Sequence, residues 1–280
     1  MIAEFAATWE LFRTTYLAGW LIAFVLGLVG VWVVARDQIF LGVAVAQAST
    51  LGVAVALWLG GFGLSALDTD AVAAALAVGA SIATALLTAR EAGRGVESPE
   101  AVTGWVFLLA ASLPVLLLAH SPHGLEEVHR LMFSTLLGAS SADLWIFAGL
   151  ALATALAVAR FQSRLLLFAL DPEMAGAVGM RRSLWSALVA VWLGVAVGLA
   201  IRVSGALYTF GCLVLPALVA KNLVREIRPL LALAPCLSVG AAVAGFVLAH
   251  RFDTPPAHMT VAVLCALLLA AWARRRLRQR

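Results

Sequence analysis

Residues 33–57 read VVARDQIFLGVAVAQASTLGVAVAL, and this stretch decides the fold. A short polar turn, Arg36-Asp37-Gln38, separates two apolar runs, and the second run continues to residue 60 without a charged residue. About 20 apolar residues are enough to cross the hydrocarbon core of a bilayer as a helix. In lipid only helices satisfy their own backbone hydrogen bonds within one segment. The pattern therefore predicts two membrane helices joined by a turn.

The same pattern extends over all 280 residues. Hydrophobic residues make up 63% of the chain and charged residues 12%, whereas an ordinary soluble domain carries roughly 25% charged residues. A soluble protein with this composition would lack the polar surface to cover itself. The predicted fold class is therefore an all-α, polytopic membrane protein with about nine transmembrane helices in a single domain over 1–280. The predicted spans are residues 16–35, 39–60, 71–89, 101–119, 144–160, 184–203, 205–220, 229–249 and 258–273.

The basic residues predict the orientation of these helices. With the N-terminus outside and the C-terminus inside, 15 of the 19 basic residues fall on the inner side. Inner loops of membrane proteins carry an excess of Lys and Arg, so we expect a cytoplasmic C-terminus. The net charge of +4 then reflects topology, and no nucleic-acid partner is expected.

Two connections are too long to be simple turns. The outer connection, 120–143, contains the apolar stretch 131–137, which is too short to span and suits a re-entrant or interfacial helix. The inner connection, 161–183, contains Asp171-Pro172-Glu173. Asp is a good N-cap and Pro suits the first helical position. We expect a short helix that begins near Pro172 and stops near Gly179.

Several functions are disfavoured by what the sequence lacks. There is no GxxxxGK[ST] motif, so the chain is not expected to bind ATP phosphates or to act as an enzyme. The helix centres are nearly free of charge, although intramembrane charges usually mark ion pathways. A secondary carrier or channel would be expected to show more of them. The polar residues expected at mid-membrane are Gln47, Ser49, Thr50, Tyr208 and Thr209.

Residues 33–57 and 203–223 (VSGALYTFGCLVLPALVAKNL) together resemble the membrane permeases of bacterial zinc, manganese and iron ABC uptake systems. The segments 131–137 and 171–179 match the family in order and position, and the resemblance covers about residues 17–273. It implies the fold of metal and cobalamin-type ABC importers, in a bacterial inner membrane. It also implies a permease homodimer or heterodimer, two cytoplasmic ATPase subunits that bind ATP, and an extracytoplasmic solute-binding protein.

One departure from the family concerns the metal path. The family helix reads roughly G-D-x-x-x-H-A, but after Gly42 this chain has Val43 in place of Asp and Gln47 in place of His. Neither is a useful ligand for a dication. Three explanations stay open: a metal that makes only transient contacts or other contacts, a chelated or larger substrate, and a member that no longer transports metal. The residues expected to line the path are Val43, Gln47, Ser49, Thr50, Tyr208 and Thr209. The hydroxyls at 49 and 50 also suit simple hydrogen bonds between helices.

The histidines are weak metal candidates. His120 and His123 lie on the outer connection, and His258 begins the last predicted helix. We expect these three to be structural or solvated rather than metal ligands.

A second implied feature is the contact with the ATPase. The resemblance places a coupling helix near residues 216–228, carried by Pro216, Ala217, Ala220, Lys221, Leu223 and Arg225. Independently of the family, a proline is expected to kink the helix at residue 216. Val219, Leu223 and Ile227 recur every four residues, which predicts one apolar stripe. Such a stripe suits a groove on a soluble partner, or anionic lipid. A non-transporting scaffold or sensor remains an alternative to a transporter.

Overall fold

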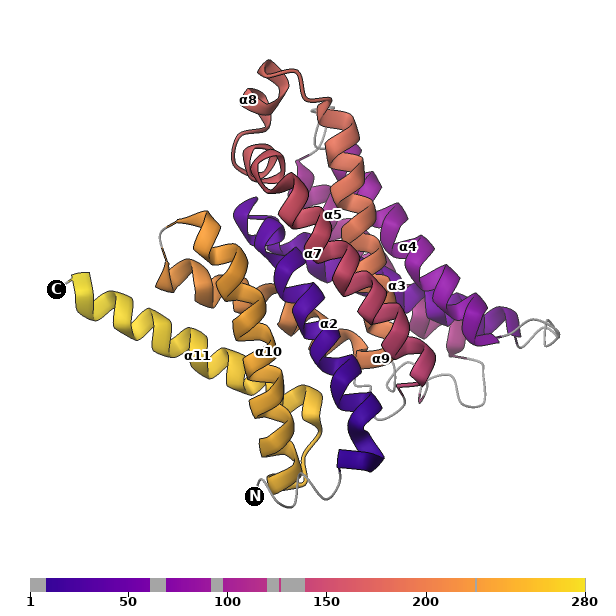
Figure 1. Cartoon of the computed structure of the whole chain (residues 1–280). Coiled ribbons are helices and arrows are strands. Elements are labelled where there is room, and N and C mark those ends of the chain that lie inside the picture. Colours follow the sequence, from indigo (N-terminus) through magenta and orange to yellow (C-terminus); the bar gives the residue numbers. More distant parts are fainter. Residues whose placement is uncertain are drawn as a thin grey trace. The chain divides into compact units, whose positions relative to one another are not determined.

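The computed structural model describes residues 9–60, 69–91, 98–119, 126, 139–224 and 226–279 (Figure 1). Within these residues the regular secondary structure is entirely helical. Eight helices are long and apolar enough to cross a membrane, which confirms the predicted fold class. The segment 131–137 lies outside the described residues. The helices are α2 (Trp9–Ala35), α3 (Ile39–Gly60), α4 (Thr69–Glu91), α5 (Pro99–Leu118), α7 (Ser141–Leu170), α8 (Pro172–Ala177), α9 (Arg182–Leu223), α10 (Ile227–Phe252) and α11 (Pro256–Gln279).

The longest helix, α9, contains two of the predicted spans. Its helical backbone is interrupted at Gly205, where φ is 75° and ψ is 169°. Glycine adopts a positive φ without the steric penalty that a side chain would add. The break lies between the predicted spans 184–203 and 205–220. Counted as two segments, α9 brings the apolar segments of the described residues to the predicted nine.

Side-chain caps set the start of several helices. The Asp171 carboxylate accepts hydrogen bonds from the backbone N–H groups of Glu173, at 3.0 Å, and Met174, at 2.8 Å. Pro172 occupies the first position of α8, and Gly179 follows it with a φ of 85°. The short helix predicted in the inner connection is therefore confirmed. Similarly, the Ser98 hydroxyl caps α5 by accepting from the Ala101 N–H at 3.1 Å.

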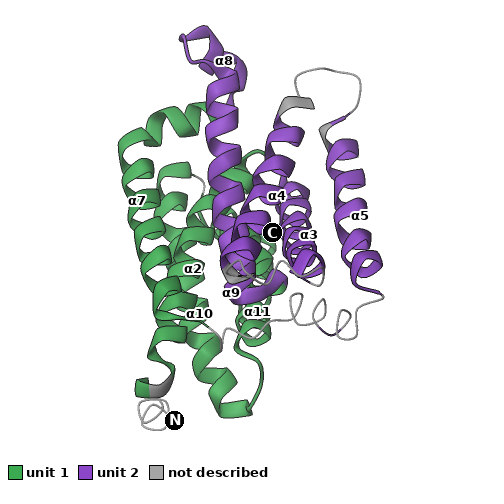
Figure 2. Ribbon diagram, turned by 90° about the vertical axis from the view of Figure 1, so that its right-hand side faces the viewer, with its two compact units in different colours: residues 1–37, 135–169, 207–280 green, residues 38–134, 170–206 purple. Residues whose placement is uncertain are grey.

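The chain divides into two compact units (Figure 2). Unit 1 comprises residues 1–37, 135–169 and 207–280, and unit 2 comprises residues 38–134 and 170–206. The last boundary between the units lies directly after the Gly205 break. The expectation of a single domain stays a prediction.

Small residues hold the helices of unit 2 close together. A Cβ atom added at Gly52 of α3 would lie 2.6 Å from the carbonyl carbon of Leu76 in α4. Added at Gly194 or Gly198 of α9, a Cβ would lie 2.7 Å from the Cα of Ile82 or Val78, respectively. Backbones approach this closely only where side chains are small, as is common between membrane helices.

Unit 1 is built around α2, most of which is buried. α2 packs against α10, where Tyr16 and Phe246 have ring centroids 5.6 Å apart. α10 also packs against α11, and a Cβ added at Gly245 would lie 2.6 Å from the Cα of Thr260. The region after Gly205 joins this group, because Val219 packs against Leu268 of α11.

Candidate translocation path and docking surfaces

α3 leaves one of its faces partly exposed. Val43, Gln47, Leu51 and Val55 recur every four residues along this face, and each is only half-buried. The neighbouring Ala44 and Ala48 are buried. The partly exposed face is therefore apolar apart from the Gln47 amide. The only side-chain atom on this face that could coordinate a passing cation is the neutral amide oxygen of Gln47.

Ser49 and Thr50 lie on a different, buried side of α3. The Ser49 hydroxyl donates to the carbonyl oxygen of Gly198 in α9, at 3.4 Å. The Thr50 hydroxyl donates to the Ala46 carbonyl oxygen of its own helix, at 3.3 Å. These contacts fit the interpretation that the hydroxyls serve helix packing. A role for either residue in translocation stays a prediction.

Tyr208 and Thr209 belong to unit 1, whereas the four candidates on α3 belong to unit 2. Both residues have 0% of their surface exposed. The Tyr208 hydroxyl donates to the Gly19 carbonyl oxygen at 2.9 Å, which ties α9 to α2. Tyr208 thus has a structural role, and its place on a translocation path stays a prediction.

The described residues contain no group of three or more His, Cys, Asp or Glu side chains that could hold a metal ion. His258 is half-buried in the first turn of α11. His120 and His123 lie outside the described residues, as does Arg225 of the expected coupling segment.

The expected coupling segment differs from its prediction in one respect. Pro216 lies within α9, and the kink expected there stays a prediction. α9 ends at Leu223 and α10 begins at Ile227. The continuous stripe expected over 219, 223 and 227 is therefore wrong, because the helix ends within it and Val219 is buried against Leu268 and Ala271.

The first part of this segment is buried and its later part is accessible. Pro216, Ala217 and Ala220 are buried, whereas Lys221 and Leu223 are exposed. The role of these residues in docking an ATPase stays a prediction. The exposed side chains of the segment beyond α9 are Glu226 and Arg228, which are charged, so Leu223 is its exposed apolar side chain among the described residues.

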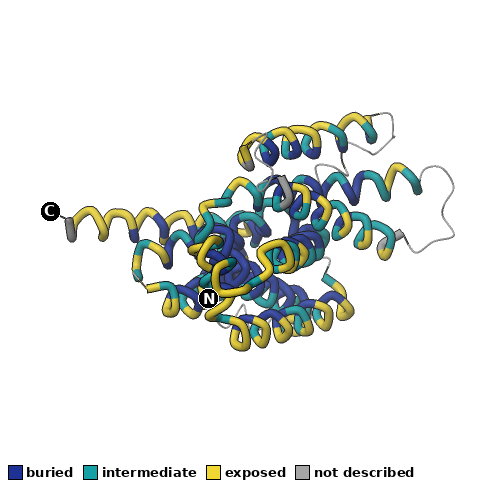
Figure 3. Tube along the Cα trace, turned by 90° about the horizontal axis from the view of Figure 1, so that it is seen from above, coloured by how far each residue is buried: buried dark blue, intermediate teal, exposed yellow. Residues whose placement is uncertain are grey.

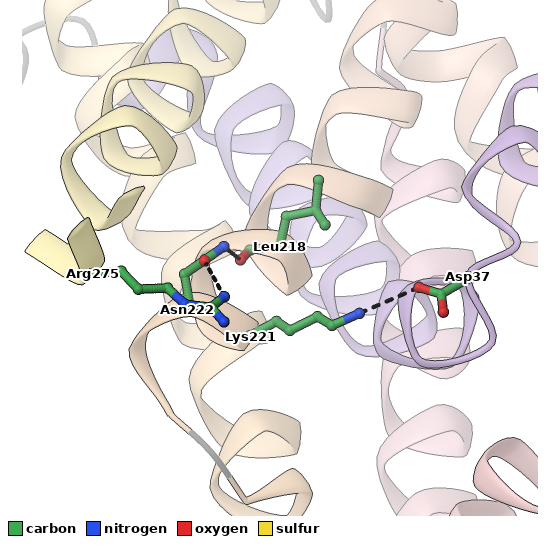
Figure 4. A network of polar contacts seen from close by, with 5 residues as sticks. All are labelled: Asp37, Leu218, Lys221, Asn222 and Arg275. Carbon is green, nitrogen blue, oxygen red and sulfur yellow. Dashed lines mark hydrogen bonds and ion pairs between the residues drawn. The ribbon is translucent and has the colours of Figure 1, made fainter. Parts of the chain in front are cut away.

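A polar network surrounds that last turn (Figure 4). The Lys221 ammonium lies 3.3 Å from the Asp37 carboxylate. The Asn222 amide donates to the Leu218 carbonyl oxygen at 2.8 Å and its oxygen accepts from Arg275 at 3.1 Å. The network joins the end of α9 to the turn after α2 and to α11. Sequence reasoning missed it, because Lys221 and Asp37 are 184 residues apart and no periodicity connects them.

The neighbouring Arg36 is also held in place. Its guanidinium lies over the Phe168 ring, 4.9 Å from the centroid. Burial lowers the pKa of Arg36 from its ordinary value, but a guanidinium remains charged at any physiological pH. Arg36 therefore links the end of α2 to α7 as a fixed cation.

α8 and its flanks expose several apolar side chains. Leu170, Met174 and Val178 are 57%, 53% and 61% exposed, respectively. The Arg182 guanidinium donates to the Glu173 carbonyl oxygen at 3.0 Å and so fastens the end of the connection to α8. This short, braced helix with exposed apolar side chains is a second candidate for contact with a soluble partner.

Eight apolar helices of spanning length, joined in places by close glycine contacts, define a polytopic α-helical membrane protein. The family can also be named. The chain belongs to the ABC 3 transport family, which matches residues 8–275.

Curated relatives cover most of the chain. The manganese import system permease protein ScaB of Streptococcus gordonii is 23% identical over 90% of this chain and 86% of its own length. The manganese transport system membrane protein MntC of Halalkalibacterium halodurans is 25% identical over 90% of this chain and 83% of its own length. A probable metal transport system membrane protein of Thermotoga maritima is 27% identical over 90% of this chain and 85% of its own length.

Solved structures show the same fold. PsaBC from Streptococcus pneumoniae, in complex with Fab, aligns with a TM-score of 0.80 at 21% identity and covers 97% of this chain and 95% of that chain. An inward-facing conformation of a putative metal-chelate type ABC transporter aligns with a TM-score of 0.76 at 16% identity. The alignment covers 94% of this chain and 85% of that chain.

Proposed function

We propose that this chain is the transmembrane permease subunit of an ABC importer for zinc, manganese or iron, as the ion or as a chelate. The observation that carries the proposal is the family match over residues 8–275. The names of the relatives, which include manganese and metal transport proteins, support the choice of cargo. The protein works in the bacterial cytoplasmic membrane with its C-terminus in the cytoplasm.

The proposed mechanism is alternating access driven by a separate ATPase. The sequence has no P-loop, so ATP is bound by two cytoplasmic partner subunits and not by this chain. Two permease copies, identical or different, form the membrane part. An extracytoplasmic solute-binding protein delivers the cargo to the outer loops.

The α3 face bears on the form of the cargo. Divalent metals are usually held by carboxylate, imidazole or thiolate ligands, whereas Val43 offers no ligand and Gln47 only a neutral oxygen. A cargo that passes this face makes weak contacts with it. Both an ion with transient contacts and a chelate that carries its own ligands are consistent with such a face.

Two surfaces are candidates for docking the ATPase. The first is the segment 216–228, of which Lys221 and Leu223 are exposed. The second is α8, whose Met174 and neighbouring Val178 are more than half exposed. Both surfaces lie on the side predicted to be cytoplasmic. The larger exposed apolar area favours α8, and its short length allows it to enter a groove on a partner.

Metal accumulation by cells tests this function. We expect cells that express the chain with its ATPase and solute-binding protein to accumulate more manganese, zinc or iron, measured by mass spectrometry of cell digests. A partner ATPase without its P-loop lysine serves as the control and should abolish the gain. Equal accumulation from the chain alone would indicate a secondary carrier. No flux of any of the three metals with every partner present would indicate a scaffold or sensor.

A further inference from the structure

The last described turns of α11, next to the C-terminus, are exposed (Figure 3). Ala271 is 4% exposed and packs with Val219 and Leu268. The residues that follow, 272–277, are all exposed, including 47% of Trp272. They carry Arg274, Arg275 and Arg276 in succession.

Helix geometry distributes these three guanidinium groups around the α11 axis. Successive residues of an α-helix are rotated by about 100° and rise by about 1.5 Å, so the three arginines point in different directions about 3–6 Å beyond Trp272. Tryptophan prefers the boundary between the acyl chains and the headgroups of a bilayer. With Trp272 at that boundary, the arginines reach the depth of the lipid phosphates.

Among the described residues of unit 1, one of the three arginines has a side-chain partner. Arg275 donates to the Asn222 side-chain oxygen at 3.1 Å. Within the described residues, neither Arg274 nor Arg276 forms an ion pair or hydrogen bond with another side chain. The acidic side chain of the adjoining network, Asp37, is paired with Lys221. Arg274 and Arg276 are therefore available to an external anion.

We propose that the exposed end of α11, residues 272–277, binds anionic phospholipid headgroups of the cytoplasmic leaflet, with Arg274 and Arg276 each contacting a phosphate on its own side of the helix. A guanidinium binds phosphate oxygens through two parallel hydrogen bonds. Basic clusters next to a membrane helix are attracted to the negative surface of that leaflet. The site does not depend on which cargo the protein carries.

Arginines at a helix C-terminus also interact favourably with the helix dipole. That effect stabilises the helix in any lipid, so it predicts no preference for an anionic headgroup. Selectivity between lipids of different charge therefore separates a binding site from a purely structural role.

The test uses the full chain, purified in a non-ionic detergent. Phosphatidylglycerol or phosphatidylcholine is titrated, and native mass spectrometry gives the apparent Kd of the first bound lipid. We expect preferential binding of phosphatidylglycerol by the wild type. Replacement of both Arg274→Gln and Arg276→Gln should weaken it at least about fivefold, because each basic residue near an anionic surface contributes a roughly fivefold gain. Arg275 is retained, so its bond to Asn222 stays intact.

The control removes the same charge from two exposed positions on the side predicted to be extracytoplasmic, by Arg13→Gln with Arg251→Gln, and should change the Kd less than about threefold. Unchanged elution on size exclusion shows that each variant is folded. Equal phosphatidylglycerol binding by wild type and the α11 variant would overturn the proposal. So would displacement of the lipid by inorganic phosphate, which would indicate a free-anion site. Loss of ATPase co-purification with unchanged lipid binding would assign the surface to a protein partner, and would also overturn it.

Discussion

Gly30 sets the distance between α2 and the second part of α9. A Cβ atom at this position would overlap the carbonyl oxygen of Leu213 and lie 2.8 Å from its carbonyl carbon. The obstructing atoms belong to the backbone, so they cannot move aside by changing a rotamer. Gly30 is therefore a packing residue of unit 1 that no larger residue can replace without separating two helices.

Replacing Gly30→Ala should destabilise the protein by about 1–3 kcal/mol, the usual effect of overpacking. The measurement is the melting temperature of the detergent-purified chain. Gly104→Ala is the matched control, because nothing lies within 4 Å of a Cβ atom at that position of α5. The control should be neutral or slightly stabilised, since alanine favours helix by about 1 kcal/mol. Equal melting temperatures for the two variants would show that α2 and α9 have room to separate.

Val43 and Gln47 support a second prediction at this scale. The double replacement Val43→Asp with Gln47→His places a carboxylate and an imidazole one turn apart on a partly exposed face of α3. An unpaired charge within the membrane is destabilising by several kcal/mol. We expect a lower melting temperature than the wild type in chelator, and recovery on addition of manganese or zinc, because a ligand bound only to the folded state stabilises it.

The control for this pair is Val43→Asn with Gln47→His, which keeps the shape but removes the charge and should respond more weakly to metal. A wild type stabilised by metal as strongly as the Asp–His variant would place the metal site elsewhere. His258, and then His120 and His123, would be the next residues to replace. If none of the proteins responds, this α3 face does not line a metal path.

At the scale of elements, α8 and the end of α9 compete as docking surfaces. Met174→Asp puts a charge on the exposed face of α8, and Leu223→Asp does the same at the end of α9. We expect Met174→Asp to reduce ATPase co-purification at least about tenfold, since burial of an unpaired charge in an interface is strongly unfavourable. Leu223→Asp should have the smaller effect, because Leu223 is 37% exposed and Met174 is 53% exposed.

The control is Phe252→Asp, at an exposed position on the side predicted to be extracytoplasmic, and it should leave co-purification unchanged. A loss confined to Leu223→Asp would move the docking site to the segment 216–228. Unchanged co-purification for both cytoplasmic variants would remove both surfaces from the ATPase interface.

The sequence predicts the elements better than the contacts between them. The bounds of α3, Ile39–Gly60, match the predicted 39–60, because a charged turn and Gly60 delimit an uninterrupted apolar run. The bounds of α8 could also be predicted, because the Asp171 cap and Gly179 are signals in the adjacent sequence. The stripe over Val219, Leu223 and Ile227 was wrong, because the pattern shows which residues are apolar but not which neighbour buries them. The Ser49 hydroxyl donates to the Gly198 carbonyl oxygen, a contact that the pattern of residues 43–50 did not indicate, and its place on the path stays a prediction.

For the whole molecule, the distribution of charge predicts the topology. With 15 of 19 basic residues on the inner side, reporter fusions at residues 65, 125 and 280 should read outside, outside and inside. The measurement combines alkaline phosphatase, which is active outside, with green fluorescent protein, which fluoresces inside, so each position has its reciprocal control. A cytoplasmic reading at 125 would invalidate this topology, because the basic residues would no longer be concentrated on one side.

The Tyr208–Gly19 hydrogen bond bears on how the protein is made. Its partners are 189 residues apart, and bacterial and other ribosomes add about 5–20 residues per second. α2 therefore enters the bilayer roughly 10–40 seconds before the partner of its Gly19 carbonyl has been synthesised. During that interval the most extensively buried helix of unit 1 lacks its contacts with the second part of α9 and with α10. A chain that stops before residue 207 therefore leaves α2 without α10 and α11.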